Sequence, residues 1–332
     1  MKRLLVFYFS FMISYLSFAH PGIGIVIDSK GNIFYTDLKQ VWKLSPDGSK
    51  TVIVQNVHTH ELCIDANDNL YGEHLWYNGE RLNTWGHYVW CLHPGGELVK
   101  VKEPTEGFLT DYSFVRDSSG NMYWVERFTV SRFKKKAPDG TITTIAEGKF
   151  RDIRWSYCTK EGIFYFIDLD RLYKLTPDGK FTLVTDELDD APSILGFMND
   201  KKHRIYGIWT DTGDNIYVAL LAAKKVKRIT PGGIVETVVY TKEPWSPTGG
   251  LFDRNGNMWL LESSLTNECR VRKITKVKLA GPAYGKTGSI LINDIVPVSI
   301  LTAVIALGVL AVRKIFSKKK WIAGKRKAVQ RT

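Results

Sequence analysis

Histidines gather in one stretch of this chain, since five of its seven lie at positions 58, 60, 74, 87 and 93. His58 and His60 open one strand-like run, and Glu73 and His74 end the next run along the chain. Imidazole groups suit zinc and carboxylates also suit calcium, so a divalent metal, Zn or Ca, is a candidate cofactor. The candidate metal ligands are His58, His60 and His74.

A second set of polar residues could bind or transform a small molecule. Arg154 can hold a carboxylate or phosphate through two parallel hydrogen bonds, and His60 can act as a base. Tyr112 and Tyr206 offer hydroxyl groups that, with Arg154, could stabilise developing negative charge. These four candidate catalytic residues fit a binding site for a small anionic molecule, a sugar or a peptide segment. The alternative is a hydrolase of lactones or esters, or a lyase.

Other enzyme classes lack a motif, because the chain has no Gly-x-Ser-x-Gly elbow, phosphate loop or His-Glu-x-x-His sequence. Aromatic residues follow the first histidines, among them Trp76 and Trp85. Their rings could stack on a sugar or an apolar group of a ligand. They could equally cap the core of their own structural element, and the sequence leaves both readings open.

The chain repeats a short motif, Asp-x-x-Gly/Asp-Asn, at residues 28–32, 65–69, 117–121, 211–215 and 253–257. A degenerate copy, which lacks the Asp and the Asn, begins at Thr159. In the fifth repeat a similar sequence begins at Asp200, but we take Asp211 as the first residue of the motif. β-Branched and aromatic residues crowd the runs on both sides, which favours strands. Gly, Asn and Asp tolerate the positive φ of a tight turn, so each copy predicts two strands joined by such a turn.

A second turn motif, x-Pro-Asp/Gly-Gly, follows the first five copies at residues 45–48, 93–96, 137–140, 176–179 and 230–233. Each unit is then a meander of four antiparallel strands, and such sheets bury both faces when they pack around an axis. We therefore predict an all-β fold over residues 20–280, a six-bladed β-propeller of four-stranded antiparallel blades. Residues 276–280 or the N-terminal segment would supply the last outer strand.

The repeats resemble NHL-type repeats and the six-bladed propellers of the gluconolactonase (senescence-marker protein) family. The GI-x-x-D-x-x-GN-x-[FY] units and the [STA]-P-[DG]-G turns carry this resemblance over residues 20 to 276. It implies the propeller fold, but propellers of this kind include hydrolases, lyases and pure binding modules. In the gluconolactonase family, a Glu, two Asn and an Asp at the start of the innermost strands hold a divalent metal.

The site is expected on the rim opposite the repeated turns, where the copies differ from one another. Five residues before each turn Asp, or its equivalent, stand Ile23, His60, Tyr112, Arg154, Tyr206 and Thr248. None is Asp, Glu or Asn, so the metal set of the gluconolactonase family is not repeated here. The candidate ligand-binding residues are His60, Glu61, Tyr112, Arg154, Tyr206, Thr248, Trp76 and Trp85. A water-filled channel mouth is the alternative.

The two ends of the chain predict export and anchoring. Residues 1–19 fit a signal peptide, with Lys2 and Arg3 before an apolar run; an uncleaved anchor is the alternative. After a linker at 281–294, residues 295–312 carry no charge and are long enough for one transmembrane helix. Lys and Arg in the tail at 313–332 place that tail in the cytoplasm. The propeller is thus expected outside the cytoplasm, in a periplasmic, lumenal or extracellular space, on a single-pass membrane protein.

The net charge of +12 comes from the two ends of the chain. Nine positive charges and no acid follow residue 312, and Lys2 and Arg3 add two, which leaves +1 for residues 4–312. A nearly neutral middle gives no basis for nucleic-acid binding. The four cysteines, at 63, 91, 158 and 269, show no Cys-x-x-Cys spacing and are expected to be free thiols.

Overall fold

The computed structural model describes residues 21–79, 82–107, 109–189, 204–264, 266 and 268–275. All of them belong to one compact unit of the chain. Within these residues, no helix has the length and apolar character needed to span a membrane. The expected signal peptide, linker, transmembrane helix and basic tail all lie outside the described residues.

The described strands form six antiparallel sheets, each built from consecutive strands. Blade 1 contains β1 (Ile25–Ile27), β2 (Ile33–Thr36), β3 (Gln40–Leu44) and β4 (Lys50–Gln55). Blade 2 contains β5 (Leu62–Ile64), β6 (Leu70–Tyr77), β7 (Trp85–Leu92) and β8 (Leu98–Glu106). Blade 3 contains β9 (Met122–Glu126), β10 (Ser131–Lys136) and β11 (Ile142–Gly148).

The second half of the ring repeats this plan. Blade 4 contains β12 (Ile153–Cys158), β13 (Phe164–Asp168), β14 (Arg171–Leu175) and β15 (Phe181–Thr185). Blade 5 contains β16 (Ile205–Thr210), β17 (Ile216–Leu220), β18 (Lys225–Ile229) and β19 (Val235–Tyr240). Blade 6 contains β20 (Trp245–Phe252), β21 (Met258–Ser264) and β22 (Cys269–Ile274).

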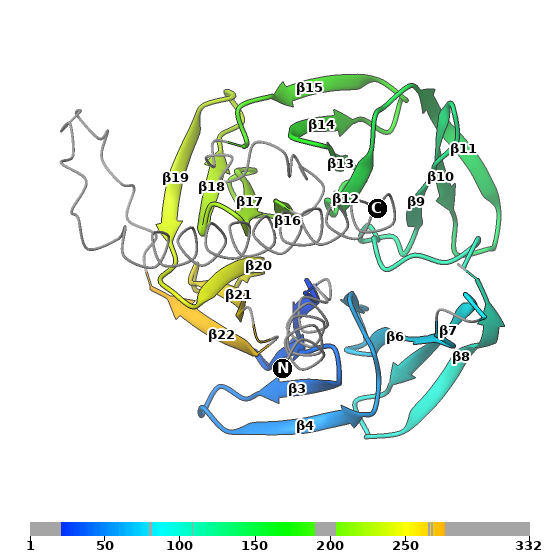
Figure 1. The fold of residues 1–332 in the computed structure, drawn as a ribbon, viewed down its shortest axis with the longest axis vertical. Helices are drawn as coiled ribbons and strands as arrows, with labels where there is room; N and C mark the ends of the chain where they lie inside the picture. Colours follow the sequence, from blue (N-terminus) through cyan, green and yellow to red (C-terminus); the bar gives the residue numbers. More distant parts are fainter. Residues whose placement is uncertain are drawn as a thin grey trace, which may run out of the picture. The chain divides into compact units, whose positions relative to one another are not determined.

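The six sheets form a six-bladed β-propeller, which confirms the predicted fold. Figure 1 shows the outer strands β4, β8, β11, β15 and β19 following one another around the ring in chain order. The first strands of the blades lie inside: β1 contacts both β5 and β20, and β16 contacts both β12 and β20. The first and last blades therefore meet through β1 and β20.

Two blades depart from four strands among the described residues. In blade 3 the segment before the turn makes a single bridge, between Arg116 and Met122, in place of an inner strand. Its backbone is used elsewhere, since the Leu109 amide donates to a histidine of blade 2. In blade 6 the predicted outer strand at 276–280 lies outside the described residues.

The repeated turns follow from their residues. In the first copy, the Asp28 carboxylate accepts hydrogen bonds from the backbone amide of Asn32 at 2.8 Å and from its side-chain amide at 2.6 Å. Asp211 makes the same pattern with Asn215, which confirms the preferred register of blade 5. In the degenerate copy the Thr159 hydroxyl replaces the carboxylate and accepts hydrogen bonds from two backbone amides, each at 3.3 Å.

Both turn motifs lie on one rim. Gly31 has φ +83°, and a Cβ built on it would lie 3.7 Å from the ring of Pro46 in the second turn of the same blade. His93, in the second turn of blade 2, places Nδ1 2.7 Å from the Asn69 side-chain oxygen of the first. His93 therefore lies on the rim opposite the variable loops, as expected.

Apolar side chains fill five of the six blade–blade interfaces among the described residues. Buried clusters join blades 1 and 2, 3 and 4, 4 and 5, 5 and 6, and 6 and 1. Burial of apolar surface is the main favourable contribution to folding, so these clusters hold the ring together. Between blades 2 and 3 no such cluster is present in the described part of the chain.

Candidate functional site: a polar seam between blades 2 and 3

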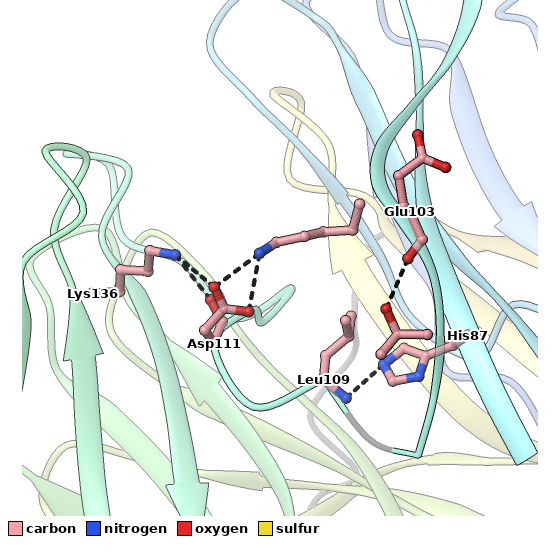
Figure 2. A network of polar contacts seen from close by, with 7 residues as sticks. His87, Glu103, Leu109, Asp111 and Lys136 are labelled. Atoms are coloured by element: carbon pink, nitrogen blue, oxygen red, sulfur yellow. Dashed lines mark hydrogen bonds and ion pairs between the residues drawn. The ribbon is translucent and has the colours of Figure 1, made fainter.

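The interface between blades 2 and 3, here called the polar seam, is held by charged side chains. Lys102 of β8 donates to both carboxylate oxygens of Asp111, at 3.0 and 2.8 Å. Lys136 of β10 donates to the same residue, at 3.1 Å to the carboxylate and 3.2 Å to the carbonyl. Figure 2 shows Asp111 facing Lys136, with His87 and Leu109 nearby. Asp111 thus joins β8 of blade 2 to β10 of blade 3.

The segment that replaces the inner strand of blade 3 is fixed at a second point. The Leu109 amide donates to Nε2 of buried His87 at 2.7 Å (Figure 2). Burial lowers the pKa of His87, against an opposing hydrogen bond to Gly107, so the ring stays neutral and can accept. These two attachments position Tyr112, whose hydroxyl accepts a hydrogen bond from Arg116 Nη2 at 2.6 Å.

Two carboxyl groups face the seam from blade 2. Leu62 pairs with Gly72 across β5 and β6, so Glu61 and Glu73, one residue further, project from the same face of the sheet. Burial raises the pKa of Glu73 to about 8, with a further rise from Glu61 and a smaller opposing effect from the His60 amide. Burial also raises the pKa of Glu61, opposed by Arg127. At neutral pH, Glu73 is therefore mainly a neutral carboxylic acid.

His60 lies beside this pair, with Nδ1 3.8 Å from Oε1 of Glu73. Its ring is 4.7 Å from that of His58, and the His58 amide donates to His74 Nδ1 at 3.1 Å. Burial lowers the pKa of His58 and His74, so both rings are neutral near pH 7. The three predicted metal ligands are thus neighbours.

A metal centre does not follow from this proximity. The described residues contain no group of three or more His, Cys, Asp or Glu side chains placed to hold a metal ion. His74 Nδ1 already accepts a backbone hydrogen bond, which occupies one of its two possible ligand atoms. Among the described residues, the structure therefore shows no assembled site for the divalent metal expected from the sequence.

Two arginines reach the seam from blades 3 and 4. Arg154 donates through Nε and Nη2 to one oxygen of Asp152, at 3.0 and 2.9 Å. Arg127 follows β9. Its side chain reaches solvent, but protein atoms lie close around much of its guanidinium group. Partial burial lowers its pKa, and Asp152, Arg154 and Glu61 act on it electrostatically. Blades 2, 3 and 4 therefore place charges around one space.

The six positions that stand five residues before each turn Asp, or its equivalent, differ in their exposure to solvent. The Ile23 amide donates to the carbonyl of His60 at 3.0 Å, so these positions are adjacent. Tyr206 is 2% exposed beside Trp155, and Thr248 is 0% exposed with its hydroxyl 3.4 Å from the Leu261 carbonyl. The partly exposed polar positions of the ring are His60, Tyr112 and Arg154, all in blades 2 to 4.

The acids that end the second strands brace the scaffold. Asp37 accepts from the Trp42 indole at 2.7 Å, and Asp168 accepts from the backbone amides of residues 151 and 152. Glu262 is fully buried and binds Arg270 and Arg272. Only Glu126 is held loosely, 3.8 Å from Lys134.

Sequence reasoning did not place Glu73 and Arg127 in the candidate set. Glu73 stands four residues after the repeat Asn, where the other blades have Thr36, Val125, Ile167, Ala219 and Leu261. One acid among small and apolar residues is a signal that aligning the second strands would have found. Arg127 gives no such signal, because it lies in a loop whose course the repeat does not determine.

Comparison with known proteins shows likeness of fold alone. No family model matches the chain, and no curated protein matches its sequence. A gluconolactonase from Xanthomonas campestris superposes with a TM-score of 0.51 at 11% identity, over 74% of this chain and 84% of that one. A luciferin-regenerating enzyme gives 0.50 at 12% identity, over 82% of this chain and 90% of that one.

A protein with a different role has the same architecture. An auxiliary nutrient binding protein from Bacteroides thetaiotaomicron superposes with a TM-score of 0.53 at 10% identity, over 77% of this chain and 69% of that one. Enzymes and a binding protein share this fold, so fold alone does not decide between the two roles. The chain is a six-bladed β-propeller of the kind found in gluconolactonase-like proteins.

Proposed function

We propose that the protein is a binding propeller that captures a small anionic molecule where the polar seam meets the central channel. The observation that carries this proposal is the charged space between blades 2, 3 and 4. It contains exposed Arg127, the Glu61–Glu73 pair and Arg154. Apolar clusters close the five other interfaces among the described residues. The interface between blades 2 and 3 instead has polar groups where the others have an apolar core.

Arg127 is the main contact for the anionic group. Guanidinium binds carboxylate or phosphate through two parallel hydrogen bonds, and the Arg127 side chain is exposed to a ligand. Arg154 already uses one edge on Asp152, so it adds positive potential and a remaining Nη1 donor. Protonated Glu73 can donate a hydrogen bond to an anion, which an ionised carboxylate would repel.

The test is ligand-dependent thermal stabilisation with a panel of carboxylic acids, sugar acids and phosphates. A bound anion raises Tm by mass action. Arg127→Ala is expected to abolish the Tm increase given by the best anion. Arg132→Ala is the matched control, because Arg132 lies in the same blade and pairs with exposed Glu147. A panel without any stabilising anion, or full stabilisation of the Arg127 variant, would contradict the proposal.

The proposal includes anchoring at the outer face of a membrane. The apolar run at 4–16 and the uncharged stretch at 295–312, followed by nine basic residues, support it. Deletion of residues 295–332 is expected to release the propeller into the soluble fraction, with its ligand response intact. Protease added to intact cells should cut the full-length propeller but not its tail. A propeller protected from protease until the cells are lysed would contradict the proposed orientation.

One observation favours a second function, as a lactone or ester hydrolase or a lyase. Glu73 has a pKa of about 8 and lies 3.8 Å from the His60 ring, as an acid paired with a base would. In this mechanism Glu73 donates a proton to the leaving oxygen, while His60 takes one from water or from the substrate. Glu73→Gln should then abolish turnover and keep anion binding. Absence of turnover on lactones, esters and β-eliminating substrates would exclude this function.

A further inference from the structure

One buried histidine holds the start of the segment that replaces the inner strand of blade 3. This segment, residues 109–116, is here called the seam segment. The Leu109 amide donates to Nε2 of His87 at 2.7 Å, and His87 is 3% exposed. Leu75 of β6 and Thr105 of β8 lie opposite His87 and flank its ring. The seam segment is therefore attached to blade 2 through a group that can take up a proton.

The bond from Leu109 determines which ring nitrogen of His87 carries the proton. An imidazole nitrogen accepts a hydrogen bond only when it carries no proton, so the neutral ring has its proton on Nδ1. Protonation would place a second N–H on Nε2, directly facing the N–H of Leu109. Two donors cannot bond each other, so a charged His87 cannot hold the seam segment in this position.

The other ring nitrogen gives a charged His87 little support. Nδ1 is buried and makes no well-aligned hydrogen bond within the described part of the chain. Burial is the main influence on the pKa of His87 and lowers it from the ordinary 6.5, while Gly107 opposes this to a smaller extent. Opening the seam segment lets water reach the ring, which then takes up a proton more readily. Protons therefore favour the open segment.

Several charged or titratable groups share the interface between blades 2 and 3 with His87. They are Glu73 and Tyr77 on β6, Cys91 on β7, Lys102 and Glu103 on β8, Asp111 and Tyr112 on the seam segment, and Lys136 on β10.

Two of these acids keep their main state when the solution becomes mildly acidic. Burial gives Glu73 a pKa of about 8, so it is mainly protonated at neutral pH and stays so in acid. Hydrogen bonds from Lys102, and then from Lys136, lower the pKa of Asp111, which therefore stays ionised in mild acid. The group whose charge changes most between about pH 7.5 and 5.5 is then His87, once water reaches it.

We propose that His87 is an acid-sensitive latch, whose neutral ring holds the start of the seam segment closed and whose protonation releases it. The lysine bridges of Asp111 remain, so release begins at Leu109 while the segment stays attached further along. Tyr112 follows directly, and its position in the polar seam then depends on pH. Protonation of a histidine at a packed contact is a general way to couple pH to conformation. This inference goes beyond the proposed function and does not need it, because the latch involves no ligand.

The test is hydrogen exchange of the full-length protein at about pH 7.5 and 5.5, with protection factors corrected for the intrinsic pH dependence of exchange. Protection of the Leu109 amide should fall about three- to tenfold in acid, because protonation below about pH 6.5 favours the open segment. The Gly107 amide is bonded to the Trp85 carbonyl at 2.7 Å and should stay protected. Amides of β12 should also keep their protection.

His87→Gln is the variant that tests the latch directly. A glutamine side chain can place its oxygen near the position of Nε2 and accept from Leu109, but it does not titrate. Protection of Leu109 in this variant should be the same at both pH values. His93→Gln is the matched control, because His93 lies on the opposite rim with Nδ1 2.7 Å from the Asn69 side-chain oxygen. The His93 variant should keep the wild-type pH response.

Three results would overturn the latch. They are equal protection of Leu109 at both pH values, an unchanged pH response in His87→Gln, and an equal loss of protection in β12. The second would assign the response to another titrating group, and the third to acid unfolding of the whole propeller.

A measurement on the wild type decides the question if His87→Gln does not fold. Nitrogen NMR of the imidazole groups reports which ring nitrogen carries the proton. The latch requires the proton of His87 on Nδ1 at about pH 7.5, and a proton on Nε2 would overturn it. These outcomes are independent of the anion panel, so failure of either proposal leaves the other standing.

Discussion

Glu61 and Glu73 project from the same face of blade 2 toward one space, and the charge of Glu61 makes ionisation of Glu73 harder. Burial is the largest cause of the raised pKa of Glu73, about 8, and the charge of Glu61 is the next. Two such carboxyls share protons as a pair, so the seam holds a proton at neutral pH.

Stability of the fold should fall as pH rises between the unfolded and folded pKa values of Glu73. The folded pKa, about 8, lies above the ordinary value of 4.5, so the unfolded chain loses the proton first. Below about pH 4.5 Glu73 is protonated in both states, and its contribution to the free energy of unfolding is complete. Above that pH the free energy of unfolding falls by at most about 1.4 kcal/mol per pH unit. Glu73→Gln removes this loss, so the variant should gain on the wild type as pH rises.

Urea denaturation at about pH 5, 6.5 and 8 measures this difference as a change in the free energy of unfolding. Glu103→Gln on the exposed part of β8 is the control, since it removes a carboxyl far less enclosed than Glu73. The Glu103 variant should keep the wild-type pH slope. An identical pH slope for the Glu73 variant and the wild type would show that Glu73 ionises normally.

The fold could be predicted because its signals are local. A turn that needs an Asp acceptor and a residue with positive φ can be read from five residues, as the bonds of Asp28 and Asp211 show. Repetition then gave the blade number and the positions of His60, Tyr112 and Arg154 on the variable rim. The missing inner strand of blade 3 could not be predicted, because its attachments to His87 and Lys102 join segments distant in sequence.

The site was only partly predictable for the same reason. Tyr206 and Thr248 occupy equivalent positions to His60, yet apolar packing between blades 5 and 6 buries Tyr206, and Thr248 is buried as well. Arg127 reaches the seam from a loop. Whether a polar residue faces a ligand depends on the neighbouring blade, and a repeat pattern describes one blade at a time.

Gly72→Ala should destabilise the interface between blades 1 and 2. A Cβ at this position would lie 2.1 Å from Cζ2 of Trp90, which is 1% exposed and cannot move without disturbing the cluster around it. Overpacking of this kind costs about 1–3 kcal/mol, or several degrees in Tm for a domain of this size. Gly95→Ala meets nothing within 4 Å and serves as the control in a thermal melt. Equal Tm values would contradict the packing described here.

Glu262→Ala should cost more stability than Glu147→Ala, although each removes a carboxylate bound to arginine. Glu262 is fully buried and bonded to Arg270 and Arg272, at 2.7 Å each, whereas Glu147 meets Arg132 at an exposed surface. Hydrogen bonds between charged groups contribute about 1.5–3 kcal/mol when buried, and exposed pairs contribute about 0–1 kcal/mol. Chemical denaturation of both variants checks the order, and similar losses would show that burial does not strengthen the Glu262 contacts.

Asp111→Asn should loosen the segment that carries Tyr112 with little effect on the rest of the propeller. The lysines that bind Asp111 come from blades 2 and 3, and their hydrogen bonds, led by that of Lys102, lower its pKa. The bridge is partly exposed, so its loss is expected to cost less than about 1 kcal/mol. Hydrogen exchange at neutral pH should accelerate up to about fivefold at the amides of residues 109–115, and amides of β12 should be unchanged. Asp139→Asn, in an exposed turn, is the control, and unchanged exchange at Leu109 would show that His87 alone holds the segment.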